Sequence, residues 1–187
     1  MKVETLRDLY VDVLKDLYDA ENKIVKALPK LAKAASSAEL QQGFQEHLEQ
    51  SKGHVERLEE VFQDLGVPAK RKKCKAIEDL LEEGKELMEA NSHSEVLDAG
   101  LIAAAQKVEH YEIASYGSAR TYAELLGEDQ AVALLEQTLE EEKQTDEKLS
   151  QLATSQIDIE PKDTVAGQRE SIARKHPAVR AGAQGTK

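Results

Sequence analysis

The chain has 187 residues, which is enough for one domain with a sizeable core. Charged residues make up 33% of it, and the formal net charge of -11 argues against nucleic acid or an anionic membrane as the main partner, since either favours a basic face. Aromatic residues make up only 4%, whereas Ala, Leu, Glu, Lys and Gln are abundant; these residues lose little freedom in a helix, so the composition predicts an all-α protein.

The first predicted helix runs from Leu6 to Ala35. Thr5 is followed three residues later by Asp8, which is a helix start signal, and apolar residues then recur at helical spacing. Pro29 lies inside this pattern. Because proline lacks the backbone N–H and clashes with the preceding turn, we expect it to bend the helix or divide it near Leu28.

The second predicted helix runs from Ala38 to Leu65. Ser36 and Glu39 form a capping-box pattern at its start. Gly66 and then Pro68 end it.

A long connection follows, with a basic run from Lys70 to Lys75 and a shorter predicted helix from about Ala76 to Ala90. The basic run is interpreted as a solvated turn, with a weak anion site as the functional alternative. Cys74 is expected to be an ordinary surface cysteine, although its cationic neighbours could activate the thiol slightly.

The third long helix is expected from Glu95 to Leu126, after a capping box of Ser92 and Glu95, and the fourth from Asp129 to Ala153. Short links within each pair of long helices, and one long connection between the pairs, are typical of the ferritin-like topology. We therefore expect residues 1–155 to form an all-α, ferritin-like four-helix bundle with one long crossover carrying a short extra helix.

The remaining residues, 156–187, contain prolines and glycines and few large apolar side chains, so we expect a flexible C-terminal tail. Deletion of Pro161 to Lys187 should barely change thermal stability. There is no apolar signal core at the start and no apolar run near the roughly 20 residues of a membrane span. With a single cysteine, the chain is expected to be cytoplasmic and free of internal disulfides.

Polar residues interrupt the apolar stripe of each long helix near its midpoint. At a rise of roughly 1.5 Å per residue, the midpoints of hairpin-linked helices lie at similar heights, so these side chains could converge in the core. Carboxylates with imidazole suit iron or manganese, and zinc is also compatible. The candidate metal ligands are Glu21, His47, Gln50, Glu109, Glu112, Glu142 and Asp146.

The charge of this cluster favours bound cations. Buried unpaired carboxylates are costly, five acids around one histidine cannot neutralise one another, and no Lys or Arg lies on these stripes. Taken singly, Glu21 would more often be a boundary residue and His47 a hydrogen-bonded core histidine. The joint pattern, together with the known di-iron and di-manganese bundles, predicts two divalent metal ions.

The ligand pattern departs from those bundles, because no Glu-x-x-His occurs at a core position. Thr145 stands where a histidine would follow Glu142, and Gln50 stands where an acid would be expected. His110 is adjacent to the proposed face and is expected beside the metal ligands rather than among them. Three further histidines are expected at the surface: His54, His93 and His176.

Several segments resemble the YciF/YciE family of ferritin-like stress proteins, and the YciF branch most closely. The resemblance covers roughly residues 3 to 155 and implies a bacterial, cytoplasmic, homodimeric protein with a role in stress responses. The candidate ligands fall on family motif positions except Gln50, where the family usually has an acid. The segments that carry the resemblance are Tyr18–Glu21, His47–Glu49, Lys72–Cys74, Ala103–Gly117 and Thr138–Asp146.

Two functions from different classes remain open. In the first, the protein is a di-metal oxidoreductase acting on dioxygen or peroxide, with Glu21, Glu112 and Glu142 as bridging or terminal ligands and His47 as the nitrogen ligand. In the second, it is a non-catalytic stress protein whose metal is structural and whose surface binds a partner. A storage cage is a weaker third reading, because no segment identifies cage-forming surfaces.

Overall fold

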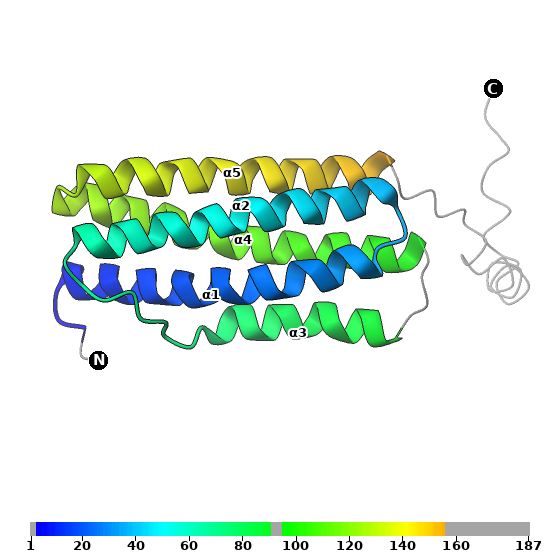
Figure 1. Ribbon diagram of the computed structural model, residues 1–187, viewed down its shortest axis with the longest axis horizontal. Coiled ribbons are helices and arrows are strands. Elements are labelled where there is room, and N and C mark those ends of the chain that lie inside the picture. Colours follow the sequence, from blue (N-terminus) through cyan, green and yellow to red (C-terminus); the bar gives the residue numbers. More distant parts are fainter. Residues whose placement is uncertain (1–2, 91–94, 156–187) are drawn as a thin grey trace, which may run out of the picture. The chain divides into compact units, whose positions relative to one another are not determined.

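The structure, a computed structural model, describes residues 3–90 and 95–155, and these residues form helices and no strand. The expected tail, 156–187, lies outside the described residues. Four long helices run alongside one another and a shorter one, α3, lies at the edge of α1 (Figure 1). The helices are α1 Leu6–Ala34, α2 Ala38–Asp64, α3 Lys75–Ala90, α4 Glu95–Leu126 and α5 Asp129–Ser155.

The helices pair as two hairpins. α1 packs mainly against α2, and α4 against α5, while α3 packs on α4 and on part of α1. The connection from α2 to α4 carries α3, which confirms the ferritin-like bundle with one long crossover. None of the described helices has an apolar stretch long enough to cross a membrane.

Most predicted helix ends are confirmed. Thr5 caps α1, because its hydroxyl accepts from the Asp8 N–H at 3.1 Å while the Asp8 carboxylate accepts from the Thr5 N–H at 3.0 Å. Gly66 and Gly127 follow α2 and α4 with φ angles of 65° and 74°, a left-handed conformation that glycine adopts without steric cost. The proposed cap at Ser92 lies outside the described residues.

Of the two outcomes expected at Pro29, the structure excludes the division, because α1 continues through Pro29 as one helix with the proline ring exposed. The predicted cap of the next helix is wrong. The cap of α2 is Ser37 rather than Ser36, since the Ser37 hydroxyl accepts from the Leu40 N–H at 3.3 Å.

A buried carboxylate from the other hairpin lies beside this cap. Asp98 of α4 accepts hydrogen bonds from the backbone N–H groups of Ser36 and Ser37 at 2.7 and 2.8 Å. It therefore satisfies amides at the start of α2 that have no partner within the helix, and it ties the α1–α2 turn to the second hairpin.

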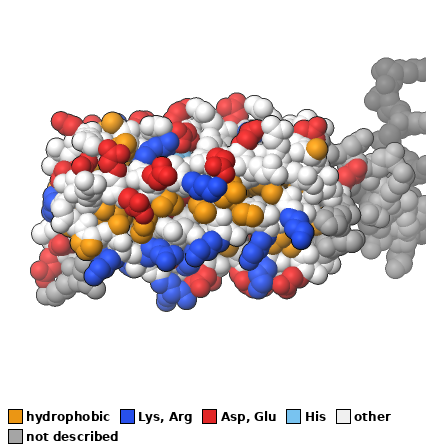
Figure 2. Space-filling view, viewed as in Figure 1, with side chains coloured by type: hydrophobic (Ala, Val, Ile, Leu, Met, Phe, Trp, Pro, Cys, Tyr) orange, Lys and Arg blue, Asp and Glu red, His pale blue; other side chains and the backbone are white. Residues whose placement is uncertain are grey.

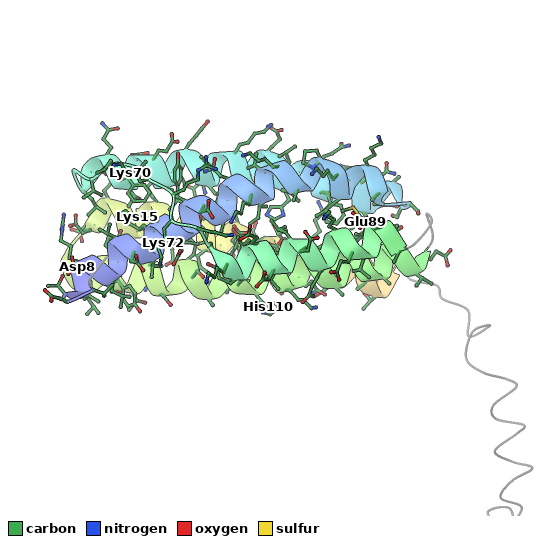
Figure 3. All side chains as sticks on the ribbon, turned by 90° about the horizontal axis from the view of Figure 1, so that it is seen from below. Asp8, Lys15, Lys70, Lys72, Glu89 and His110 are labelled. Carbon is green, nitrogen blue, oxygen red and sulfur yellow. The ribbon has the colours of Figure 1, made fainter. Side chains whose placement is uncertain are left out.

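The crossover is held tightly against the bundle. Lys72 lies on the α1 side of the molecule (Figure 3), where its ammonium group contacts Asp12 at 2.6 Å and Asp16 at 2.8 Å. Cys74 is buried, not a surface cysteine as predicted: its N–H donates to the Asp19 carboxylate at 2.9 Å, and its Sγ lies 3.0 Å from the Tyr111 hydroxyl. The prediction failed because it treated the basic run as solvated throughout.

The core consists of two apolar clusters, one toward each end of the bundle. In α1, residues 10–17 belong to one cluster and residues 20–32 to the other, and α2 and α4 divide in the same way. A polar layer separates them. The largest members of the two clusters are Phe44, Ile77 and Leu101 in one, and Tyr10, Phe62 and Tyr116 in the other.

Candidate metal centre

Five of the predicted ligands come together in the polar layer between the two apolar clusters. Each is positioned by a long helix whose neighbouring turns are anchored in apolar contacts above and below. Their side chains are buried, with at most 3% of each residue exposed. They are Glu21 of α1, His47 of α2, Glu109 and Glu112 of α4, and Glu142 of α5.

A sixth residue, His54, joins them, so the prediction that it is a surface residue is wrong. It is fully buried, with Nδ1 at 3.1 Å from Glu21 Oε1 and 3.0 Å from Glu142 Oε1. The sequence carried a signal for it: His54 follows His47 by seven residues, two helical turns, and therefore shares its face of α2. Ser51, between them, is also fully buried.

The ligand atoms form two groups that share one carboxylate. His47, Glu109, Glu112 and Glu142 offer atoms that all lie within 4.8 Å of one another, and so do Glu21, His54 and Glu142. Within the first group, the His47 ring nitrogens lie 3.4 Å from Glu109 Oε1 and 3.6 Å from Glu142 Oε2. Two adjacent cation sites bridged by Glu142 would fit this arrangement.

Many polar atoms of this layer have no hydrogen-bond partner. Buried polar atoms are nearly always paired in folded proteins, because an unmet donor or acceptor costs free energy. A cation would satisfy carboxylate oxygens and neutral imidazole nitrogens together. The unpaired atoms are Glu21 Oε2, Glu109 Oε2, both carboxylate oxygens of Glu112 and of Glu142, His47 Nε2 and His54 Nδ1.

The pKa values reflect the same excess of negative charge. Burial, with the charge of Glu142, raises the pKa of Glu109 well above its usual range, and burial, with the charge of Glu21, does the same for Glu112. For His54, burial lowers the pKa, but the charges of Glu21 and Glu142 outweigh it and raise the value to about 10. Without cations the layer therefore retains protons that divalent ions could replace.

For Glu142 the balance is reversed. Burial raises its pKa, but the close approach and positive charge of His47 and His54 outweigh burial and hold the pKa well below the usual range. Glu142 therefore stays ionised between the two histidines, which suits the carboxylate that both groups share.

Residues around the layer hold the candidate ligands in place. The Tyr116 hydroxyl donates to Glu21 Oε1 at 2.6 Å. His54 Nε2 lies 2.9 Å from the Glu141 carboxylate, which also accepts two hydrogen bonds from Arg57 at 2.8 and 2.9 Å. Carboxylate partners of this kind fix the ring orientation of metal-binding histidines.

The structure does not bring Gln50 and Asp146 into either group. Gln50 Oε1 accepts from the Thr145 hydroxyl at 3.4 Å, and Asp146 accepts from the Gln106 amide at 3.2 Å. Four residues turn a helix by about 40° more than a full circle, which carries Asp146 past Glu142 toward the bundle surface. His110, 3.5 Å from Asp146, points away from the bundle (Figure 3).

Open space next to the candidate ligands is small. One cavity of about 10 Å³ is lined by His47 and Thr145, and another of about 20 Å³ is lined by His47 and Glu109. A cavity needs about 10–15 Å³ to hold one water molecule. Each of these two cavities beside His47 therefore has room for about one water molecule.

A family model described as "Domain of unknown function (DUF892)" matches residues 5–161. Protein YciF of Escherichia coli strain K12 is 49% identical over 158 residues, which make up 84% of this chain and 95% of YciF.

Solved structures agree with this similarity. The crystal structure of the E. coli stress protein YciF gives a TM-score of 0.81 at 48% identity, covering 84% of this chain and 99% of YciF. YcfI from Rhodopseudomonas palustris, described as "a putative structural protein", gives a TM-score of 0.77 at 42% identity, covering 80% of this chain and 95% of YcfI. A Xanthomonas campestris protein gives a TM-score of 0.65 at 18% identity, covering 89% of this chain and 98% of that protein. At this identity the likeness shows a common fold alone.

Proposed function

The chain belongs to the DUF892 family, together with the E. coli stress protein YciF, and we propose that its polar layer holds two divalent metal ions. The observation that carries the proposal is the sharing of Glu142 by two groups of ligand atoms. Four buried carboxylates, those of Glu21, Glu109, Glu112 and Glu142, carry a charge of −4 when ionised, and two divalent ions carry +4. Two ions with neutral histidines would thus make the layer electrically neutral.

In this proposal His47, Glu109 and Glu112 hold one ion, Glu21 and His54 hold the other, and Glu142 contacts both. Carboxylate and imidazole ligands suit iron or manganese, and zinc is also compatible. Iron or manganese would supply one-electron redox chemistry toward dioxygen or peroxide. The protein would contribute the orientation of its ligands, the low dielectric of the layer and the exclusion of bulk water.

A structural role is the second candidate function. The ligands come from all four long helices, and ions bound only by the folded state would stabilise the bundle by mass action. The observation that favours this role is the closure of the layer, in which the ligands are almost fully buried and the adjacent cavities hold about one water. In this case a partner would be bound by the surface of the bundle.

The first test measures metal content. Elemental analysis of protein purified without chelator should find two equivalents of iron or manganese per chain. Absence of bound metal even after reconstitution would overturn the proposal.

Melting curves of the wild type and Glu142→Gln, each with and without Mn²⁺, test the assignment of the shared carboxylate. Mn²⁺ should raise the melting temperature of the wild type and not that of the variant. Without metal, the variant should be the more stable protein, because it loses repulsion among buried acids while keeping its shape. The matched control is Glu140→Gln, an exposed acid two residues away, which should respond to Mn²⁺ as the wild type does. Four coinciding curves for wild type and Glu142→Gln would rule out the buried centre.

Turnover separates the two functions. Each protein is loaded with Fe²⁺ and then mixed with peroxide or dioxygen. If the centre is a redox centre, the wild type should oxidise iron at a higher rate than the Glu142→Gln variant. Equal rates in a protein that nevertheless binds two ions would favour the structural role.

The homodimer implied by the family resemblance belongs to the same proposal. Sedimentation equilibrium should give twice the mass of the 20.7 kDa chain, and a monomer at all concentrations would contradict it.

A further inference from the structure

A groove of about 270 Å³ lies on the outside of the bundle where α3 crosses beside α1 and α4, and the metal proposal does not use it. We call it the α1–α3–α4 groove. Most of its surface is apolar, because the turns of the three helices present aliphatic side chains to it. The floor is formed by Ala27, Leu31, Leu81, Met88, Ala105 and Val108.

The rim of the groove is cationic in an otherwise acidic protein. In Figure 2, basic side chains gather over α1 and its border with α3, whereas acidic side chains are frequent over α2 and α5 and also occur along the outer edge of α3. Four lysines and two glutamates at the rim leave a local charge of +2, against −11 for the whole chain. The rim residues are Lys23, Lys26 and Lys30 on α1 and Glu78, Glu82 and Lys85 on α3.

Two of these lysines are available to a ligand. Lys23 contacts Asp19 at 2.8 Å, and Lys85 contacts Glu82 at 2.7 Å. Lys26 and Lys30 have no ion-pair partner within residues 3–90 and 95–155. They lie one turn apart on the same face of α1, so both ammonium groups can reach one anion while their aliphatic stems rest on the apolar floor.

The size of the groove limits what it can take. Its volume of about 270 Å³ lies just below the roughly 300–1,000 Å³ of pockets for drug-sized ligands, which suits a smaller ligand such as a medium-length alkyl chain. Apolar pockets with one or two polar groups at one end fix the orientation of such a ligand. The occupant that matches both the floor and the rim is an amphiphile with one anionic end.

We propose that the α1–α3–α4 groove binds a single-chain carboxylate of about eight to ten carbons, with its head on Lys26 and Lys30 and its tail along the apolar floor. The tail would run toward the candidate metal centre, because the 20 Å³ cavity beside His47 and Glu109 shares Leu31, Ala105 and Val108 with the groove. The proposal is independent of whether that centre holds metal.

The test is calorimetric titration of the full chain with decanoate, after removal of metal so that the carboxylate has no ion to bind. One saturable site per chain is expected. Each methylene from butanoate to decanoate should raise the affinity by up to about fourfold, and decylamine, with the same chain and the opposite charge, should bind at least tenfold more weakly.

Two variants locate the site. Lys26→Glu/Lys30→Glu should weaken decanoate binding at least tenfold, while the matched double reversal Lys52→Glu/Lys143→Glu, at exposed lysines of α2 and α5, should change it less than twofold. Ala27 is half-buried in the floor of the groove, and Ala27→Phe should fill the space above it and abolish decanoate binding. The circular dichroism spectrum should remain that of a helical protein.

Vesicles of phosphatidylglycerol separate a free carboxylate from a lipid headgroup as the source of the anion. Decanoate binding without co-sedimentation supports the proposal. Co-sedimentation without decanoate binding, absence of saturable binding, or equal decanoate binding by Lys26→Glu/Lys30→Glu would each overturn it. Success or failure here leaves the count of bound metal ions unchanged, so the two proposals can fail separately.

Discussion

The apolar ends of the bundle and its polar middle are built by the same four helices and differ in what they leave unsatisfied. At the ends, side chains such as Phe62 and Leu101 are almost completely buried and need no partner beyond contact. In the middle, Glu112 and Glu142 are buried just as deeply, yet none of their carboxylate oxygens has a hydrogen-bond partner. Fold stability therefore comes from the ends, and the middle is maintained at a cost.

The contributions of the two regions to stability also depend differently on pH and on bound metal. Burial of a large apolar side chain contributes about 1.5–3 kcal/mol and depends little on pH or metal. The contribution of the middle layer depends on protons and cations, because both neutralise buried carboxylates. Substitutions in one region or the other should separate these behaviours.

The largest effect is expected from Phe62→Ala in an apolar cluster. Loss of a fully buried aromatic side chain should reduce the free energy of unfolding by about 3–5 kcal/mol. Urea denaturation should show the same loss with and without Mn²⁺, since Phe62 is not among the candidate ligands. A loss that changes with metal would show that the ends and the middle are coupled.

A smaller effect is expected from pH in the metal-free protein. The folded-state pKa values of Glu109, Glu112 and His54 are raised, so the folded state binds more protons than the unfolded state. The proton bound by His54 stabilises the folded state fully below pH 6.5, and this stabilisation is lost as the pH rises toward about 10. The raised pKa values of Glu109 and Glu112 also make stability fall with rising pH, beginning above their ordinary pKa of 4.5. From His54 alone, stability should fall between pH 6.5 and 9 by about 1 kcal/mol per pH unit, which is the slope for one proton.

The contribution of Glu142 does not oppose this trend, because its pKa is lowered and its stabilisation is lost only as pH falls below 4.5. Thermal melts of the metal-free protein at pH 6, 7, 8 and 9 should show this fall in stability. Saturating Mn²⁺ should cancel the trend, since the ions replace the protons. Metal-free protein whose stability rises over this range would contradict the assigned electrostatics.

The smallest effect is expected from Asp146→Asn, at the edge of the polar layer. Asp146 lies outside both ligand groups, and surface substitutions rarely change stability by more than about 0.5 kcal/mol. Metal content and the response to Mn²⁺ should match the wild type. Loss of an ion in this variant would extend the centre to Asp146.

The helices could be predicted from the sequence because apolar spacing and capping residues are local signals. The four mid-helix interruptions were visible for the same reason, since a Glu or His in an apolar register stands out. His54 was missed because it was judged alone; its seven-residue spacing from His47 places both rings on one face.

Features that depend on packing between distant segments could not be predicted. Cys74 is buried where the crossover lies against Asp19 and Tyr111, and the amides of Ser36 and Ser37 find their acceptor in Asp98 of another hairpin. The α1–α3–α4 groove likewise depends on where α3 settles. At Gly84, α3 lies close to α4, since a Cβ added there would be in ordinary van der Waals contact with the Ala104 Cβ at 3.7 Å.

The hydrogen bonds of Asp98 make the two hairpins interdependent during folding. Its carboxylate is 61 and 62 residues distant in sequence from Ser37 and Ser36, so these amides are protected only after the second hairpin has docked on the first. Until then the α1–α2 turn can close, while the first turn of α2 exchanges its amide hydrogens with solvent. In hydrogen exchange, Ser36 and Ser37 should therefore become protected with the assembly of the whole bundle rather than with the formation of their own hairpin.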